Sequence, residues 1–384
     1  MHALLPTATL KSRNRLRVRE PYPVSPAARW ILRAALALPF LVIALVTILH
    51  PSLLSSSVNA DLALRVSEID WTRGDARWLQ QLSPPAGVLL AKLIPGGTAG
   101  LSIVGAIGAG WFLQHLIQVM KDKQWRMRNV VLMTIAVGAN PVFAYLVVGN
   151  LLGFLSLATF GLGTVEMYRF VARRNTDSGF RAGVWFLTCS LIDASGLLLV
   201  IVALVAAPFL SVARAGERGA RLANILVVFY PSFAAAGSLV LMQLVYLEDP
   251  FALYAGAIQY DPANWSIFAG LFTTPGGWST LLAGLLGATA GLLSSRPQAA
   301  LMAPLALVVL VLGRVFGLVP IAGVGYVFLA TSMIALALTP RLTTPLRRIS
   351  LTLIALSFAI LGWVTGMTRV PVTDWISAFL EGLS

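Results

Sequence analysis

The stretch Asn59-Ala-Asp-Leu-Ala-Leu-Arg-Val-Ser-Glu-Ile-Asp70 opens a charged segment, residues 59–97, that separates two long apolar runs. Further apolar runs of about 20 residues, the length that crosses a bilayer as a helix, fill most of the remaining chain. The chain is 58% hydrophobic and only 11% charged, without a long polar segment that could form a separate soluble domain. The sequence therefore predicts an all-α polytopic bundle, with the charged segment as a loop outside the membrane.

The apolar runs predict about eleven crossings when the run 182–210 is counted as two. The ranges are 29–50, 98–120, 129–148, 151–171, 182–210, 222–247, 278–295, 298–317, 321–339 and 349–368. The run 182–210 is long for one span and is interrupted by Asp193-Ala-Ser-Gly196. It can be a single span or a hairpin of two short helices. Charge favours the hairpin, because only the hairpin keeps the arginines at 214–221 on the cytoplasmic side. Asn140-Pro141 predicts a kink in the third span.

The distribution of positive charge predicts the orientation of the bundle. The chain has 28 Lys and Arg residues against 15 Asp and Glu, a net charge of +13. Of these cations, 22 fall in or beside one set of alternate loops, which is the positive-inside asymmetry of membrane proteins. The N-terminus is therefore expected in the cytoplasm and the C-terminus outside. Because topology explains the basic charge, nucleic acid is not expected as a partner.

This orientation divides the chain into three parts. Residues 1–28 form a basic cytoplasmic arm, residues 29–368 form the transmembrane bundle, and residues 369–384 form an external tail. The external loops are 51–97 and 248–277, and the aromatic content of the second predicts an interfacial helix at headgroup level. Cys189 is the only cysteine, so no disulfide can form within the chain. The histidines show no metal-ligand spacing.

A helix over 61–71 of the first loop would place three charged side chains on one face: Asp61, Arg65 and Glu68. A neighbouring apolar stripe would consist of Leu62, Val66 and Ile69. This pattern predicts an amphipathic helix on the membrane surface whose polar face meets water. Asp70 would point away from Asp61 on the same helix. Pro84-Pro85 predicts an extended turn before an apolar helix over 86–95.

The first loop resembles the first external loop of the GT-C superfamily of glycosyltransferases, integral membrane enzymes that use polyprenyl-phosphate sugars. In that superfamily an Asp opens the loop soon after the first span. A Gly-Asp, a Tyr-Pro-Pro-Leu-like element and an apolar helix follow it. Here these places are taken by Asp61, Gly74-Asp75 and Ser83-Pro84-Pro85-Ala86-Gly87.

The resemblance extends over residues 30–260. Asn140-Pro141 matches a Pro common in the third span, and Glu248-Asp249-Pro250-Phe251 is similar to a later Asp-Pro loop. Two positions depart from the family pattern. Its paired acids are reduced here to Asp61, preceded by Asn59-Ala60, and Ser83 and Ala86 replace the Tyr and Leu around the prolines. The soluble C-terminal domain of many members is not expected within this sequence.

The resemblance implies that the chain moves a sugar from a polyprenyl-phosphate lipid to an acceptor hydroxyl or amide on the external face. The resemblance also implies that the chain lies among the lipids of a bacterial plasma (inner) membrane. Its expected role is in the assembly of cell-envelope glycan. Asp61 would be the catalytic base. Substrate-binding candidates are Arg65, Glu68, Arg73, Asp75, Arg77 and Lys92, whose cations would stabilise the departing phosphate or contact lipid headgroups. A divalent cation could assist, but the sequence does not require one.

Two other functions stay open from the sequence. A secondary transporter or flippase is suggested by the broken segment around Asp193 and by the Pro-bearing spans, but few intramembrane charges and no inverted repeat accompany them. A hydrogen-bonded helix break is the preferred interpretation of Asp193. A non-catalytic subunit, bound to a membrane protein partner, is suggested by the reduced acid motif. Glu166 is expected to form only a local ion pair with Arg169.

Overall fold

The computed structural model describes residues 21–55, 57–72, 77–173, 176–210, 218–254, 260–294, 297–319, 326–339, 345–368 and 370–381. Within these ranges every regular element is a helix and there is no strand. The α-helices up to residue 173 are α1 (Pro26–Leu49), α2 (Pro51–Ser55), α3 (Val58–Glu68), α4 (Pro85–Leu93), α5 (Gly97–Asp122), α6 (Met127–Gly138), α7 (Pro141–Gly149) and α8 (Leu151–Arg173). Those that follow are α9 (Thr176–Ile192), α10 (Ala194–Leu210), α11 (Arg218–Leu247), α12 (Ser266–Thr273), α13 (Pro275–Leu292), α14 (Met302–Val315), α15 (Tyr326–Leu338), α16 (Pro345–Met367) and α17 (Val370–Glu381).

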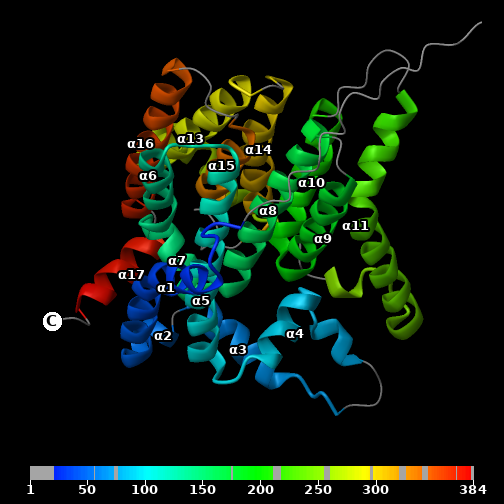
Figure 1. The fold of residues 1–384 in the computed structure, drawn as a ribbon. Coiled ribbons are helices and arrows are strands. Elements are labelled where there is room, and N and C mark those ends of the chain that lie inside the picture. Colours follow the sequence, from blue (N-terminus) through cyan, green and yellow to red (C-terminus); the bar gives the residue numbers. More distant parts are fainter. Residues whose placement is uncertain are drawn as a thin grey trace, which may run out of the picture.

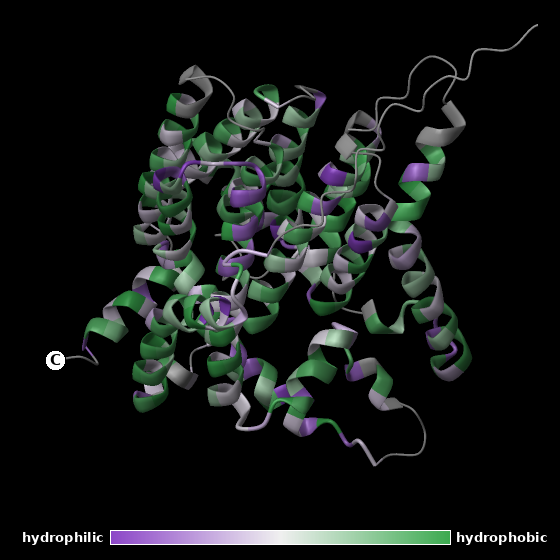
Figure 2. Cartoon of the chain, viewed as in Figure 1, coloured by the Kyte–Doolittle hydropathy of each residue, from purple (hydrophilic) through white to green (hydrophobic). Residues whose placement is uncertain are grey.

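Six helices among the described residues are long and apolar enough to cross a membrane. They are α1, α5, α8, α11, the helical segment Gln298–Val315 that ends in α14, and α16. The bent pair of α6 and α7 makes a seventh if it is counted as one span. Figure 2 shows hydrophobic residues along the length of these helices. The chain is therefore an all-helical protein with the composition of an integral membrane bundle.

Two predicted interruptions are found in the bundle. Asn140-Pro141 separates α6 from α7, and the two helix axes differ by 57°. This confirms the predicted kink, since Pro141 cannot supply the backbone N–H that would continue the helix. Asp193 separates α9 from α10, and the two helices pack against each other (Figure 1). The run 182–210 is thus broken into two helices, and the first of them begins earlier than predicted, at Thr176.

The interior at the first spans is built from aromatic rings and close backbone contacts. Phe40, Phe112, Phe143 and Phe154 come from α1, α5, α7 and α8, and their ring centroids lie 5.5–6.2 Å apart. A Cβ on Gly105 would stand 2.0 Å from the carbonyl oxygen of Val147. Only glycine therefore lets α5 approach α7 this closely, which is how helices commonly pack within lipid.

Polar contacts at the end of α5 join it to two later helices. Arg169 pairs with Glu166 at 2.5 Å, as predicted, and also with Asp122 of α5 at 3.0 Å. The ammonium of Lys123 donates to three carbonyl oxygens at the C-terminal end of α15, at 2.7–2.8 Å. A cation at this place satisfies carbonyls that have no partner within the helix.

The helix of the first loop differs from the predicted one. α3 begins at Val58 and ends at Glu68, so it does not reach Asp70. The Asp70 carboxylate instead accepts from the N–H and the hydroxyl of Thr72, at 3.1 and 2.6 Å. Such a local turn competes with helix formation. The predicted placement of Asp70 opposite Asp61 on one helix is therefore wrong.

The second loop and the C-terminus also differ from the prediction. A single interfacial helix was expected over 248–277, but the described part has the 3-10 turns η2 (Ala252–Tyr254) and η3 (Pro262–Trp265) and then the eight-residue α12. Pro262 begins η3 and Pro275 begins α13, so the prolines divide the segment into short pieces. The predicted tail contains α17, which packs against α2, α7 and α16 and lies beside α1 and α2 in Figure 1.

Candidate functional site around Asp61

The site is built on α3, which begins at a serine cap. The Ser57 hydroxyl accepts from the N–H of Ala60 at 3.2 Å, satisfying one of the free donors of the first turn. Leu62, Val66 and Ile69 are buried, as the apolar stripe predicts. Burying each of these side chains stabilises the helix by about 1.5–3 kcal/mol relative to exposure. α3 is thus held with its charged face outward.

Asn59 fastens the start of α3 to the junction of α7 and α8. Its side-chain amide donates to the carbonyl oxygen of Val148 at 2.9 Å, and its side-chain oxygen accepts from the N–H of Leu151 at 2.8 Å. Ser102 of α5 donates to the same Val148 oxygen at 2.7 Å. An aspartate could not donate at this position. The residue that departs from the paired acids of the GT-C pattern therefore has a structural role.

Asp61 is an exposed carboxylate that makes no hydrogen bond or ion pair with any described residue. It follows the cap by one helical turn, so it shares a face with Ser57. Glu68 is also exposed and without such a partner among the described residues, but it lies at the other end of α3, about 10 Å further along the axis. Asp61 is therefore free to accept a proton or a hydrogen bond.

Arg65 lies one turn beyond Asp61 and connects α3 to the segment before α4. Its guanidinium donates a long hydrogen bond of 3.4 Å to the carbonyl oxygen of Ser83, just before α4. Asp193 lies in the turn between α9 and α10. Asp193 accepts hydrogen bonds from the N–H and the hydroxyl of Ser195 and so caps α10. This confirms the preferred interpretation of Asp193 as a hydrogen-bonded helix break.

α4 packs on the same turn through a glycine. α4 begins at Pro85, with Pro84 in extended conformation before it, close to the predicted turn and helix. A Cβ on Gly87 would stand 2.4 Å from the carbonyl oxygen of Ile192, the last residue of α9. This close approach brings the first loop to the turn that holds Asp193. Figure 1 shows α3 and α4 together at one end of the bundle.

Among the remaining predicted substrate-binding residues, the structure describes the side chain of Lys92 alone. The ammonium of Lys92 lies 5.4 Å from the ring centroid of Trp71, beyond the C-terminal end of α3. Arg77 begins the 3-10 helix η1 (Arg77–Gln81), and its side chain lies outside the described part of the structure. Arg73 and Asp75 lie outside the described residues altogether. The structure therefore keeps Asp61 and Arg65 one turn apart on α3, and it places Lys92 against Trp71.

Tyr145 lies beside the start of α3 and was not among the predicted site residues. Its ring edge and the Ser57 side chain both lie against Gly149, within 4 Å of where a Cβ on that glycine would be. Tyr145 stands in an apolar stretch of α7, where a tyrosine is an ordinary residue at the end of a span, so the sequence offered no signal.

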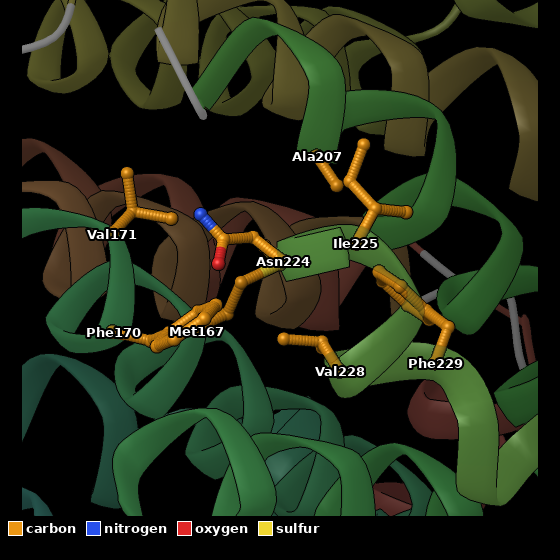
Figure 3. A pocket seen from close by; sticks show the side chains of 8 residues that line it. All are labelled: Met167, Phe170, Val171, Ala207, Asn224, Ile225, Val228 and Phe229. Atoms are coloured by element: carbon orange, nitrogen blue, oxygen red, sulfur yellow. The ribbon is translucent and has the colours of Figure 1, made fainter. Parts of the chain in front are cut away.

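Among the described residues, Asp61 belongs neither to a metal-binding cluster nor to the apolar groove beside α8. Within the described ranges, no group of three or more His, Cys, Asp or Glu side chains is arranged to hold a metal ion. An apolar groove of about 250 Å³ lies between α8, α10 and α11, with Asn224 as its one polar lining side chain (Figure 3). Met167 and its neighbours place this groove at the far end of α8 from Leu151. It is separate from the Asp61 site.

Comparison of the chain with models of protein families, with characterised proteins and with solved structures finds no match.

Proposed function

We propose that this chain is a GT-C-like membrane glycosyltransferase that moves a sugar from a polyprenyl phosphate to an acceptor on the external face. The observation that carries the proposal is Asp61, an exposed carboxylate without a partner among the described residues, on a helix fastened to the bundle by Asn59. A general base needs both properties, since it must reach the acceptor and must be held in place. Arg65, one turn away, supplies a cation for the donor phosphate.

The order of helices supports a topology of eleven crossings. Seven candidate spans are counted with the bent pair of α6 and α7, and α9, α10, α13 and α15 would bring the total to eleven. The contacts of α17 with α2, and of η1 with η2, would then join segments on the external side. A lipid-borne donor could reach Arg65 from the membrane surface on which α3 and α4 would lie.

The transfer replaces one bond at the anomeric carbon of the sugar with another. The acceptor oxygen forms a bond to the anomeric carbon of the sugar while the bond from that carbon to the phosphate oxygen breaks. Asp61 takes the acceptor proton, and the leaving group is a polyprenyl phosphate. Arg65 offsets the negative charge that grows on the leaving oxygen, where a positioned cation lowers the barrier most.

The test uses full-length protein in nanodiscs with short-chain prenyl-phosphoryl hexoses and pentoses that carry a radiolabel on the sugar. Asp61→Asn should insert and fold normally yet lose transfer by at least about a hundredfold, the usual scale for a general base. Asp177→Asn is the matched control, because Asp177 is an exposed acid that pairs with Arg181 one turn away on α9. Undiminished transfer by Asp61→Asn would remove the carboxylate from this role.

The same assay separates the two alternative functions. Donor binding without turnover in wild-type protein, together with co-purification of another membrane protein, would indicate a non-catalytic subunit. Movement of the intact lipid-linked sugar across the bilayer without transfer would indicate a flippase. Asp193, the residue that suggested a flippase, accepts capping hydrogen bonds from Ser195, and these contacts do not favour a flippase or a non-catalytic subunit over a transferase.

A further inference from the structure

The groove between α8, α10 and α11 has an apolar floor and a polar mouth (Figure 3). Seven of its eight lining side chains are apolar, and five of these are buried: Met167, Phe170, Ala207, Val228 and Phe229. Val171 and Ile225 are half-buried, whereas Asn224 is exposed. The only amide of the lining therefore stands where the groove opens.

Contacts with α9 fix two walls of the groove. A Cβ on Gly183 would stand 2.6 Å from the carbonyl oxygen of Val228, so α9 approaches α11 closely at this glycine. The rings of Phe186 and Phe229 stack, with centroids 5.4 Å apart. On the side of α8, a Cβ on Gly179 would stand 3.0 Å from the Phe170 ring. The open space thus lies within a tightly packed frame.

The chemistry of the lining indicates an amphipathic occupant. Figure 3 shows the Asn224 amide directed across the groove toward Val171. Within the described part of the chain this amide makes no hydrogen bond. Water fits poorly, because a bound water needs two to four polar partners and the lining offers one amide. A hydrocarbon chain that carries a hydrogen-bond acceptor near one end satisfies both the floor and the mouth.

Positive charge at the start of α11 indicates the headgroup of this occupant. Arg218 and Arg221 precede Ile225 by seven and four residues, so the helix period places both positions on the groove-lining face of α11. Their side chains lie outside the described part of the structure. Arg221 is about 4.5 Å nearer to the start of α11 than Asn224. A phospholipid has the same order of groups, with a phosphate before the ester carbonyls and the acyl chains.

α11 is also the candidate span that a bound lipid would stabilise most. Among the six candidate spans of the described residues, it has the smallest buried share, 11% against 22–89% for the others. A lipid in the groove contacts α8, α10 and α11 together, and so adds packing to a helix that has little of its own.

We propose that the groove binds one anionic phospholipid of the leaflet that the charge distribution predicts to be cytoplasmic. An acyl chain fills the apolar floor, an ester carbonyl accepts a hydrogen bond from Asn224, and the phosphate lies beside the first turn of α11. The site is independent of the proposed transferase function, because lipid binding is measured without a sugar donor.

The binding test is native mass spectrometry of the delipidated full-length protein, titrated with dioleoyl phosphatidylglycerol or dioleoyl phosphatidylcholine. Wild-type protein should bind one phosphatidylglycerol at least about fivefold more tightly than phosphatidylcholine. Ile225→Trp fills the mouth with an indole and should lose this tight binding. Val245→Trp, at an exposed position near the other end of α11, should keep it. Equal binding of phosphatidylglycerol by wild type and Ile225→Trp would overturn the proposal.

Two further substitutions test the polar contacts. Asn224→Leu should weaken the binding of both lipids about three- to tenfold, the range for one neutral hydrogen bond. Arg221→Gln should weaken phosphatidylglycerol about fivefold and leave phosphatidylcholine unchanged, because only phosphatidylglycerol has a net charge. Equal affinity of wild-type protein for the two lipids would refute an anionic headgroup. Undiminished binding by Asn224→Leu would refute the contact with the amide.

A stability measurement keeps the proposal testable if Ile225→Trp folds poorly. Phosphatidylglycerol should raise the unfolding temperature of wild-type protein in detergent, since a ligand that binds only the folded state stabilises it. The rise should persist in Val245→Trp and shrink in the double variant of Asn224→Leu and Arg221→Gln. An equal rise in all three proteins would show a general effect of lipid and would count against a site in the groove. A wild-type dimer that Ile225→Trp abolishes would identify a second copy as the occupant instead.

Discussion

The side-chain amide of Asn59 donates to the carbonyl oxygen of Val148 across 2.9 Å, joining the first external-loop helix to the end of α7. The two residues are 89 positions apart, so the contact sets the position of α3 relative to the bundle. The same contact therefore also sets the position of the Asp61 carboxylate, because Asp61 lies on the same short helix.

Asn59→Asp should destabilise the protein more than an average polar substitution. The aspartate can still accept from Leu151 but cannot donate to Val148, and a buried anion then faces a carbonyl oxygen. We expect a loss of about 1–3 kcal/mol, the usual consequence of a mismatched buried polar group. Thermal unfolding in detergent and protease sensitivity of residues 51–97 would measure it. Ser67→Ala, at an exposed position of α3, should change stability by less than about 0.5 kcal/mol.

Gly87→Ala should loosen the contact between the first loop and the turn at Asp193. The new Cβ would overlap the Ile192 carbonyl oxygen, so α4 must move away from α9 at a cost of about 1–3 kcal/mol. Gly237→Ala provides the control, because no atom lies within 4 Å of a Cβ there and alanine favours a helix interior. Equal thermal unfolding of the two variants would contradict the tight packing of α4.

Asp193→Ala and Asp193→Asn should differ in stability. Alanine removes the oxygen that accepts from Ser195, and loss of an N-cap destabilises a protein by about 1 kcal/mol. Asparagine keeps an acceptor oxygen and should have a smaller effect. Thermal unfolding of the two variants beside Ser195→Ala would show the order. If asparagine proves as harmful as alanine, the charge of the Asp193 carboxylate is more important than its role as a cap.

Arg169→Gln should be far more harmful than Arg181→Gln, although both arginines pair with an acid in the preceding turn. Arg169 is buried and pairs with Glu166 and Asp122, so removing it breaks two buried ion pairs at once, at a cost of about 3–5 kcal/mol. The side chains of Arg181 and Asp177 are 53% and 58% exposed, so this pair contributes about 0–1 kcal/mol. Comparable unfolding temperatures for both variants would count against a buried Arg169 network.

Much of the architecture follows from local patterns. Apolar runs of membrane-spanning length, the Asn140-Pro141 kink, the break at Asp193 and the buried stripe of α3 depend on residue type and spacing over a few turns of helix. The boundaries of α3 could not be read in the same way, because Ser57 and Asp70 each form local hydrogen bonds that compete with helical continuation.

The composition of the site depended on contacts between distant segments. An exposed face bearing Asp61, Arg65 and Glu68 could be derived from the period of the helix, because an amphipathic helix must bury its apolar stripe. Three contacts could not be derived in this way. Asn59 anchors α3 on Val148, Gly87 of α4 lies against Ile192, and Lys92 contacts the ring of Trp71. These relationships arise from the docking of α3 and α4 on α7 and α9, which depends on how side chains far apart in the chain pack in three dimensions.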